Sequence, residues 1–416
     1  MVNTISNIIT FKRKNSFFAF SVLFYLATVA IADGTVFFYA SAVLIIAAGL
    51  LDCLKGRKIV VFPIFFSMIA FIILNIILIA YGNSLYPSAS IKRLITFSLN
   101  ILVNYFVFVF ITKNYNGNLL LIGKWFIRFA LILIAYILVA GTSSVFSGRF
   151  GQDVPYLLGL SGTSDGVGFN SNFVCQIFFI AFSFSLLLFC YFRKRRYVFS
   201  SICFIAFSIL TGSRTGILVL AIFSILFYLM LTKKLVKKFL IVLSSALIVI
   251  IGYFCLLKIP FLYENIGHRF EVLFNGLTQS GNYEIASSAY TRNDMIKFGL
   301  SMIADRPLIG YGLDSYAQLS PYGTYSHNNF IEILFSCGVI GFIFYYFGII
   351  ISILQLFKIQ LKRISPIVAL AFSLLVSSLL LNISHVDYVD RGSLFILFMS
   401  AAILFNQKKY LRTINR

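Results

Sequence analysis

The stretch GTYSHNNFIEILFSCGVIGF, residues 323–342, indicates the fold class because it joins a polar segment directly to an apolar run. His327, Asn328 and Asn329 come first, and the residues that follow are almost all apolar except for Glu332. About twenty apolar residues in an α-helix are enough to cross the hydrocarbon core of a bilayer, which is about 30 Å thick. The stretch therefore predicts a membrane helix with a histidine and two amides at its mouth.

Similar apolar runs recur along the whole chain. The 416 residues are 60% hydrophobic and 11% charged, whereas soluble domains have about 25% charged residues. We therefore expect an all-α fold, a polytopic bundle of about twelve transmembrane helices that forms a single membrane domain over residues 1–416. The expected helices span residues 16–32, 35–52, 59–81, 94–112, 122–141, 172–192, 197–212, 216–232, 239–257, 328–350, 365–383 and 394–406.

The basic residues indicate the orientation of the bundle. The net charge is +21, and Lys and Arg cluster on one side of the expected membrane, where Asp52 is the one acid. Cytoplasmic loops carry such a basic excess, so both termini are expected in the cytoplasm. The excess then reflects orientation and contact with anionic membrane lipid, and no nucleic-acid partner is expected. The clusters lie at residues 12–14, 55–58, 193–196, 233–238, 358–363 and 408–416.

Two long segments are expected on the outer side, residues 142–171 and residues 258–327. The cytoplasmic connections leave no room for a further domain, so we expect any chemistry at the outer face. The sequence has no P-loop, which would supply nucleotide energy. Its six cysteines form no CxxC motif and no Cys/His cluster, so neither a metal site nor a cofactor nor a disulfide framework is expected.

The larger outer segment has internal structure. Residues 292–305 predict an amphipathic helix on the membrane surface, capped by Thr291 and ended before a proline. In PLIGYGLDSY, residues 307–316, Gly310 and Gly312 predict a tight bend that lets the backbone approach another segment closely. The apolar face of the predicted helix consists of Met295, Phe298 and Met302.

Among the outer basic residues, Arg214 is the strongest candidate for an anion site. It lies in TGSRTG, residues 211–216, where two expected helices are joined by almost no loop. A guanidinium that is partly desolvated near the membrane surface needs an anionic partner. Arg214 is either a clamp for phosphate oxygens, which its planar fork fits, or an interfacial arginine that snorkels to lipid phosphates.

Three further outer arginines are weaker candidates. Arg292 is expected at the start of the amphipathic helix, as a phosphate ligand or as a solvated helix-start charge, which is mildly unfavourable there. Arg149 in GRF and Arg269 in HRFE are either supporting anion ligands or ordinary loop charges.

His327 is the candidate general base. An imidazole has a pKa near 6.5, and a helix N-terminus favours its neutral form, which can take a proton from a hydroxyl. The alternative is a structural cap of the helix through Ser326, His327 and Asn328. Glu332, which is costly to ionise in hydrocarbon, either orients a basic partner or packs between helices.

These motifs together resemble the O-antigen ligase and Wzy-type O-antigen polymerase superfamily. Ser171 and Thr215 depart from the family pattern, where proline and glycine are usual. The resemblance covers residues 145–350. It rests on PLIGYGLDSY (307–316) followed by SHNNFIEILFSCGVIGF (326–342), on TGSRTG (211–216), on YTRNDMIKFGLSMIADRP (290–307) and on GFNSNF (168–173).

The resemblance implies a metal-independent, inverting glycosyltransferase of the GT-C type in the bacterial inner membrane. It implies that the donor is a glycan on undecaprenyl pyrophosphate and that the active site faces the periplasm. By the same resemblance, Arg214 and Arg292 hold the pyrophosphate and His327 activates the acceptor hydroxyl. A chain-length regulator is an expected partner on the same ground alone.

Three functions remain open. The favoured one is a polymerase that joins lipid-linked repeat units, and the second is a ligase that transfers the glycan to lipid A–core. The third is a flippase for lipid-linked oligosaccharide, although a transporter would need charges or broken helices near the midplane. Within the enzyme class, a carboxylate base at Asp33, supported by His385, Asp387 and Asp390, is the alternative to His327.

Overall fold

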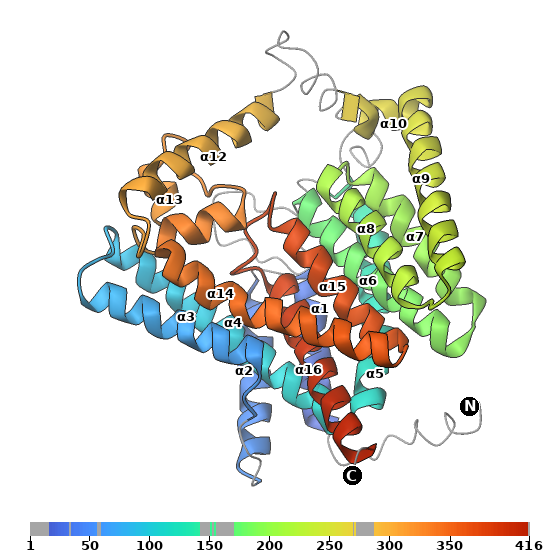
Figure 1. Cartoon of the computed structure of the whole chain (residues 1–416), viewed down its shortest axis with the longest axis horizontal. Coiled ribbons are helices and arrows are strands. Elements are labelled where there is room, and N and C mark those ends of the chain that lie inside the picture. Colours follow the sequence, from blue (N-terminus) through green and yellow to red (C-terminus); the bar gives the residue numbers. More distant parts are fainter. Residues whose placement is uncertain are drawn as a thin grey trace.

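The computed structural model describes residues 16–32, 35–55, 60–141, 150–151, 154, 170–268, 270–271 and 287–414. Within these residues the chain forms helices and no strand (Figure 1). The first nine are α1 (Ser16–Ile31), α2 (Val36–Cys53), α3 (Pro63–Ala80), α4 (Pro87–Lys113), α5 (Tyr115–Ala140), α6 (Ser171–Phe192), α7 (Arg195–Leu210), α8 (Arg214–Met230) and α9 (Leu235–Lys258). They are followed by α10 (Pro260–Leu262), the π-helical turn η3 (Tyr263–Gly267), α12 (Ser287–Asp305), α13 (Ser315–Leu319), α14 (Asn329–Lys362), α15 (Pro366–Leu381) and α16 (Arg391–Ile414).

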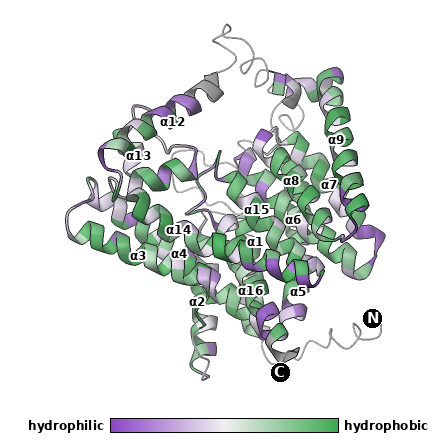
Figure 2. Cartoon of the chain, in the orientation of Figure 1, coloured by the Kyte–Doolittle hydropathy of each residue, from purple (hydrophilic) through white to green (hydrophobic). Residues whose placement is uncertain are grey.

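The prediction of an all-α polytopic membrane protein is confirmed. Seven of the described helices are long and apolar enough to cross a membrane, and three shorter ones are also apolar. Each of the twelve expected spans coincides with one helix, although α14 and α16 extend well beyond residues 350 and 406. The extension of α16 is polar and basic, whereas that of α14 remains largely apolar and is interrupted by glutamines and lysines. Figure 2 shows apolar residues over most of the bundle.

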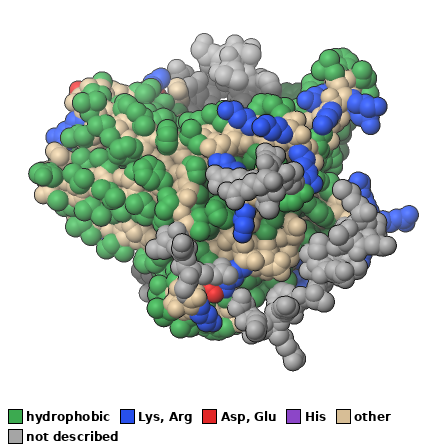
Figure 3. All heavy atoms as spheres, turned by 60° about the horizontal axis from the view of Figure 1, so that its bottom comes forward, with side chains coloured by type: hydrophobic (Ala, Val, Ile, Leu, Met, Phe, Trp, Pro, Cys, Tyr) green, Lys and Arg blue, Asp and Glu red, His purple; other side chains and the backbone are tan. Residues whose placement is uncertain are grey.

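The helices pack around one large apolar core, in which α14 lies against α3, α6 against α7, α15 against α8, and α16 against α4. In Figure 1, α12 and α13 lie at the top of the bundle and the C-terminal end of α16 lies at the bottom. Turning this bottom forward, Figure 3 shows Lys and Arg side chains on the surface with very few acidic ones. The described part of this face is therefore mainly basic.

The amphipathic helix of the outer segment begins earlier than expected. The structure starts α12 at Ser287, so Thr291 lies inside the helix and the prediction that it caps the start was wrong. Arg292 consequently lies on the second turn. The end of the helix at Asp305, ahead of Pro307, agrees with the prediction. The apolar face of α12 packs on α13 and α14 in a small second core that includes Met295, Tyr316, Ile331 and Phe335.

The helix α14 is broken at Gly338, and the 307–312 segment with Gly310 packs on this break. Gly338 has φ +62° and ψ −170°, which opens the helix and leaves backbone groups without partners inside it. The segment 307–312 supplies those partners, so irregular backbone at membrane depth is satisfied by protein. Side chains at Gly310 or Gly338 would clash with the facing backbone, and the predicted close approach of Gly310 is confirmed. The bonds run from Tyr311 N to Phe335 O (3.0 Å), Gly312 N to Ser336 O (2.8 Å), Val339 N to Pro307 O (2.8 Å) and Ile340 N to Leu308 O (3.3 Å).

Candidate functional site

The turn between α7 and α8 places Arg214 at the first position of a membrane helix. Gly212 has φ +63°, a left-handed conformation that suits glycine. Ser213 caps α8, because its side chain accepts a hydrogen bond from the Gly216 N–H at 3.2 Å. The TGSRTG sequence thus forms a tight turn into α8, and Arg214 is the first residue of this helix.

The start of α6 lies against the start of α8. Asn170 caps α6, and its side chain accepts from the Asn172 N–H at 2.9 Å. A Cβ at Gly216 would overlap the sulfur of Cys175 on α6, so the missing side chain is what allows this approach. Two helix N-termini, each with the partial positive charge of a helix start, consequently lie close together.

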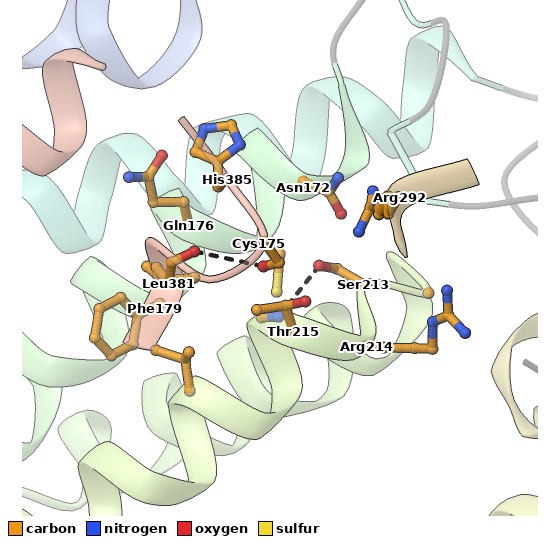
Figure 4. A pocket seen from close by; sticks show the side chains of 14 residues that line it. Asn172, Cys175, Gln176, Phe179, Ser213, Arg214, Thr215, Arg292, Leu381 and His385 are labelled. Carbon is orange, nitrogen blue, oxygen red and sulfur yellow. Dashed lines mark hydrogen bonds between the residues drawn. The ribbon is translucent and has the colours of Figure 1, made fainter. Parts of the chain in front are cut away.

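A cavity of about 170 Å³ lies at these two helix starts. Arg214 comes from α8, Arg292 from α12, Gln176 from α6, and His385 from the loop between α15 and α16. In Figure 4 the two arginines stand at one end of the cavity, and His385 and Gln176 stand at the other. Segments more than a hundred residues apart in the sequence therefore build one site.

The lining of this cavity has one sign of charge. It carries the guanidinium groups of Arg214 and Arg292, and no acidic residue lies among the described residues that line it. Helix N-termini and fork-shaped guanidinium donors are the groups with which proteins bind phosphate and other anions. We call this space, defined by Arg214, Arg292, Ser213 and Asn172, the basic cavity.

His327 lies beside the basic cavity and does not line it. Its backbone has φ +54°, and its ring packs on Tyr325 with 4.3 Å between the ring centroids. Burial, and then the neighbouring Arg292 and His385, lower the pKa of His327 to about 4. The imidazole is therefore neutral at physiological pH and able to accept a proton.

The helix start after His327 is clamped to the loop between α15 and α16. Asn328, not His327, caps α14: its side chain accepts from the N–H groups of Phe330 and Ile331 at 3.0 and 3.1 Å. The Asn329 side chain accepts two N–H groups of the loop, those of Asp387 and Tyr388, at 3.0 and 3.1 Å. The asparagines thus hold the His327 segment against the His385 loop.

Glu332 also supports this segment. It is 2% exposed, and its Oε2 accepts the backbone N–H of Ser326 at 2.9 Å. Glu332 therefore anchors the turn that carries His327. The predicted candidates Arg149 and Arg269, and the alternative base Asp33, lie outside the described residues.

No sequence pattern marked Gln176 or Asn172 as a site residue, and His385 was expected only as support for the alternative base Asp33. His385 lies in HVDYVDR, residues 385–391, the densest group of titratable residues in the last third of the chain, and this density was the available signal. Gln176 and Asn172 had no signal, because single amides in apolar helices are common. Within the described part of the chain, no group of three or more His, Cys, Asp or Glu residues could hold a metal ion.

Residues 199–346 match the family model described as O-Antigen ligase. The match includes Arg214, Arg292 and His327, together with the 307–312 segment and the break at Gly338. The resemblance predicted from the motifs is confirmed over these residues. No curated protein matches the chain.

Proposed function

We propose that this protein is an integral membrane glycosyltransferase that joins lipid-linked repeat units of a surface polysaccharide, as an O-antigen-type polymerase. The family match over residues 199–346 supports the O-antigen ligase and polymerase class in general. The choice of polymerase within that class, the undecaprenyl pyrophosphate donor and the residue roles below belong to the proposal. We also propose a location in the bacterial inner membrane, which the family match favours, with cytoplasmic termini and a periplasmic site, which the basic clusters favour by the positive-inside rule.

The basic cavity is the observation that carries the proposal. Two guanidinium groups and two helix N-termini face a space without a described carboxylate. A pyrophosphate diester carries two negative charges and several acceptor oxygens, which match these donors. The cavity is therefore assigned to the pyrophosphate of the donor, with Arg214 and Arg292 as its ligands.

The reaction is a single displacement at the anomeric carbon of the donor. The acceptor hydroxyl oxygen forms a bond to this carbon while the bond from the carbon to the pyrophosphate oxygen breaks. The bonding electron pair leaves with the lipid pyrophosphate, whose charge the two arginines stabilise. The hydroxyl proton passes to neutral His327, a transfer worth about 10²–10⁴ in rate. Attack from the face opposite the leaving group inverts the configuration.

The first experiment examines the surface polysaccharide of a strain that lacks the gene. If the protein is a polymerase, this strain carries a single repeat unit, and the wild-type gene restores the ladder whereas His327→Ala does not. Polymer that accumulates on the lipid carrier, with none on lipid A–core, identifies a ligase instead. A ladder that is unchanged in the deletion strain contradicts both assignments.

The second experiment tests the two arginines in purified protein. Arg214→Gln and Arg292→Gln each remove a charged hydrogen-bond donor, so we expect the KM for the lipid-linked donor to rise by about 10–100-fold. Arg292→Lys keeps the charge but loses the fork, so it recovers only part of the affinity. Lys297→Gln is the matched control on α12, because Lys297 is exposed and lies near Asp294 at 3.7 Å. An equal effect of the control and the arginine variants would refute the assignment.

A further inference from the structure

A second cavity, of about 330 Å³, shares His385 with the basic cavity. Arg93 and Thr96 on α4, Tyr325 and Glu332 around the His327 segment, and Asp390 beside α16 line it. The proposed reaction so far assigns this space no role. Arg93 is already paired, since its Nε donates to Asp314 at 3.0 Å.

The two cavities share a wall. His385 lines both of them. Gln176 of the basic cavity donates from Nε2 to Oδ1 of Asp390 in the second cavity at 2.8 Å. This Asp390 oxygen also accepts the Ser393 N–H at 2.6 Å, which holds the wall against the start of α16.

His327 lines neither cavity, but it lies beside residues that line each of them. Tyr325, whose ring packs on His327 at 4.3 Å, lines the second cavity. Arg292, which lines the basic cavity, is close enough for its charge to act on the imidazole. A proton acceptor between two spaces suits a reaction whose two substrates enter from different sides.

The chemistry of the second cavity differs from that of the first. It combines the carboxylates of Glu332 and Asp390 with two arginines and the rings of Tyr325 and Tyr388. Two carboxylates balance two arginines, so this lining lacks the positive excess with which the basic cavity attracts a pyrophosphate. Carboxylates also accept hydrogen bonds from sugar hydroxyls, and tyrosine offers a flat apolar face to a sugar ring.

We propose that the second cavity is the acceptor site, which binds the terminal sugar of the acceptor glycan and presents one hydroxyl to His327 from the side opposite the pyrophosphate. This inference rests on the proposed glycosyltransferase function and adds a location and a substrate class for the acceptor. Glu332 and Asp390 then hold the other hydroxyls, and Thr96 forms the rim on α4.

The test uses an acceptor that cannot act as donor: the repeat oligosaccharide released by mild acid from the cell's lipid-linked pool and coupled to an alkyl aglycone. Thr96→Trp puts an indole into the cavity, and Glu332→Gln removes a charge while keeping an acceptor for the Ser326 N–H. Ile95→Trp is the matched control, because Ile95 is the preceding residue of α4 and is 55% exposed. For each variant, the KM for this acceptor, the KM for the lipid-linked donor and the thermal shift produced by inorganic pyrophosphate are measured.

We expect Thr96→Trp to raise the acceptor KM about tenfold or more, a loss of about 1.4 kcal/mol of binding. Glu332→Gln also raises the acceptor KM, and Ile95→Trp leaves the acceptor KM unchanged. Donor KM and pyrophosphate shift stay at wild-type values, which also shows that the variants are folded. An unchanged acceptor KM in both cavity variants, or a raised donor KM alone, overturns the inference. Wild-type protein that transfers nothing to this acceptor contradicts the proposed function itself.

Discussion

At the scale of single residues, the pKa of His327 is set by the residues that the fold brings to it. Its own sequence neighbours are a serine and two asparagines, which carry no charge. The fold buries half of the ring and brings Arg292 and His385 to it, and these factors lower its pKa to about 4. An imidazole with this pKa is a weaker base than an ordinary one, but it stays in the active neutral form over the physiological range.

The pH dependence of activity follows from this value. With a pKa near 4, kcat/KM for the donor stays nearly constant from pH 8 to about 5.5, where a histidine of pKa 6.5 would retain about a tenth of its activity. The acid limb of kcat lies at higher pH than that of kcat/KM, because bound pyrophosphate offsets the charge of Arg292. Initial rates with labelled donor over pH 4–8 test this. A tenfold loss of kcat/KM per pH unit below 6.5 would contradict it.

The same residue links folding stability to pH. The folded pKa of His327 lies below the unfolded value of about 6.5, so the unfolded chain binds the proton first. The contribution of His327 to folding stability is therefore fully present above pH 6.5 and is lost as pH falls toward 4. We expect His327→Gln to lose less stability than wild type over this interval in thermal unfolding of detergent-solubilised protein. Parallel losses in the two proteins would show that the residue is not linked to folding in this way.

At the scale of elements, the break in α14 depends on one glycine. Gly338 combines a positive φ with close contact to the backbone of Leu308. This combination of φ and ψ is essentially restricted to glycine, and another residue there costs about 1–3 kcal/mol before any clash is counted. The 307–312 segment is hydrogen-bonded to the break. A change at Gly338 therefore also displaces the chain that connects α12 to the His327 loop.

Gly338→Ala is therefore expected to lower the unfolding temperature and to reduce transfer activity. Gly252→Ala on α9 is the matched control, because a Cβ there meets nothing within 4 Å, and alanine is favoured over glycine in a helix by about 1 kcal/mol. Thermal unfolding and activity are measured for both variants. Equal stability of the two alanine variants would show that α14 does not need the break.

The packing of α6 on α8 allows a double-mutant test. Gly216→Ala places a methyl group on the Cys175 sulfur, so we expect a lower unfolding temperature and a higher donor KM. Cys175→Ala removes that sulfur and should recover part of the loss, with an interaction energy of about 0.5–3 kcal/mol between the two sites. Additive effects of the two substitutions would place the damage elsewhere.

At the scale of the whole molecule, the charge distribution predicts which end faces the cytoplasm. Lys237 is in the KKLVKK cluster, on the first turn of α9, and Gln318 lies on α13, which we propose to be on the outer side; both side chains are exposed. In protein whose six cysteines are replaced, we expect Gln318→Cys to react with a membrane-impermeant maleimide in cells with a permeable outer membrane. Lys237→Cys should react only after the inner membrane is opened. The reverse labelling pattern would invert the proposed topology.

The sequence by itself determined the all-α membrane class and the order and approximate bounds of the apolar helices, because apolar run length is a local property. It also singled out Arg214, Arg292 and the glycines of the 307–312 segment, which stand out from their immediate surroundings. It misjudged the start of α12, because amphipathic spacing marks a helix face but not its first turn. The helices α14 and α16 run further than expected, because scattered lysines and amides lower the hydropathy of their last turns without ending the helix.

Only the tertiary structure decided how these residues act together. The basic cavity exists because Gly216 lets α6 approach α8, and because α12 and the His385 loop close over them. The second cavity needs α4 beside the same loop, and the low pKa of His327 needs Arg292 from another helix. Each of these features depends on distances between residues far apart in the chain. Such distances are set by packing and backbone hydrogen bonds, which no local pattern of residues contains.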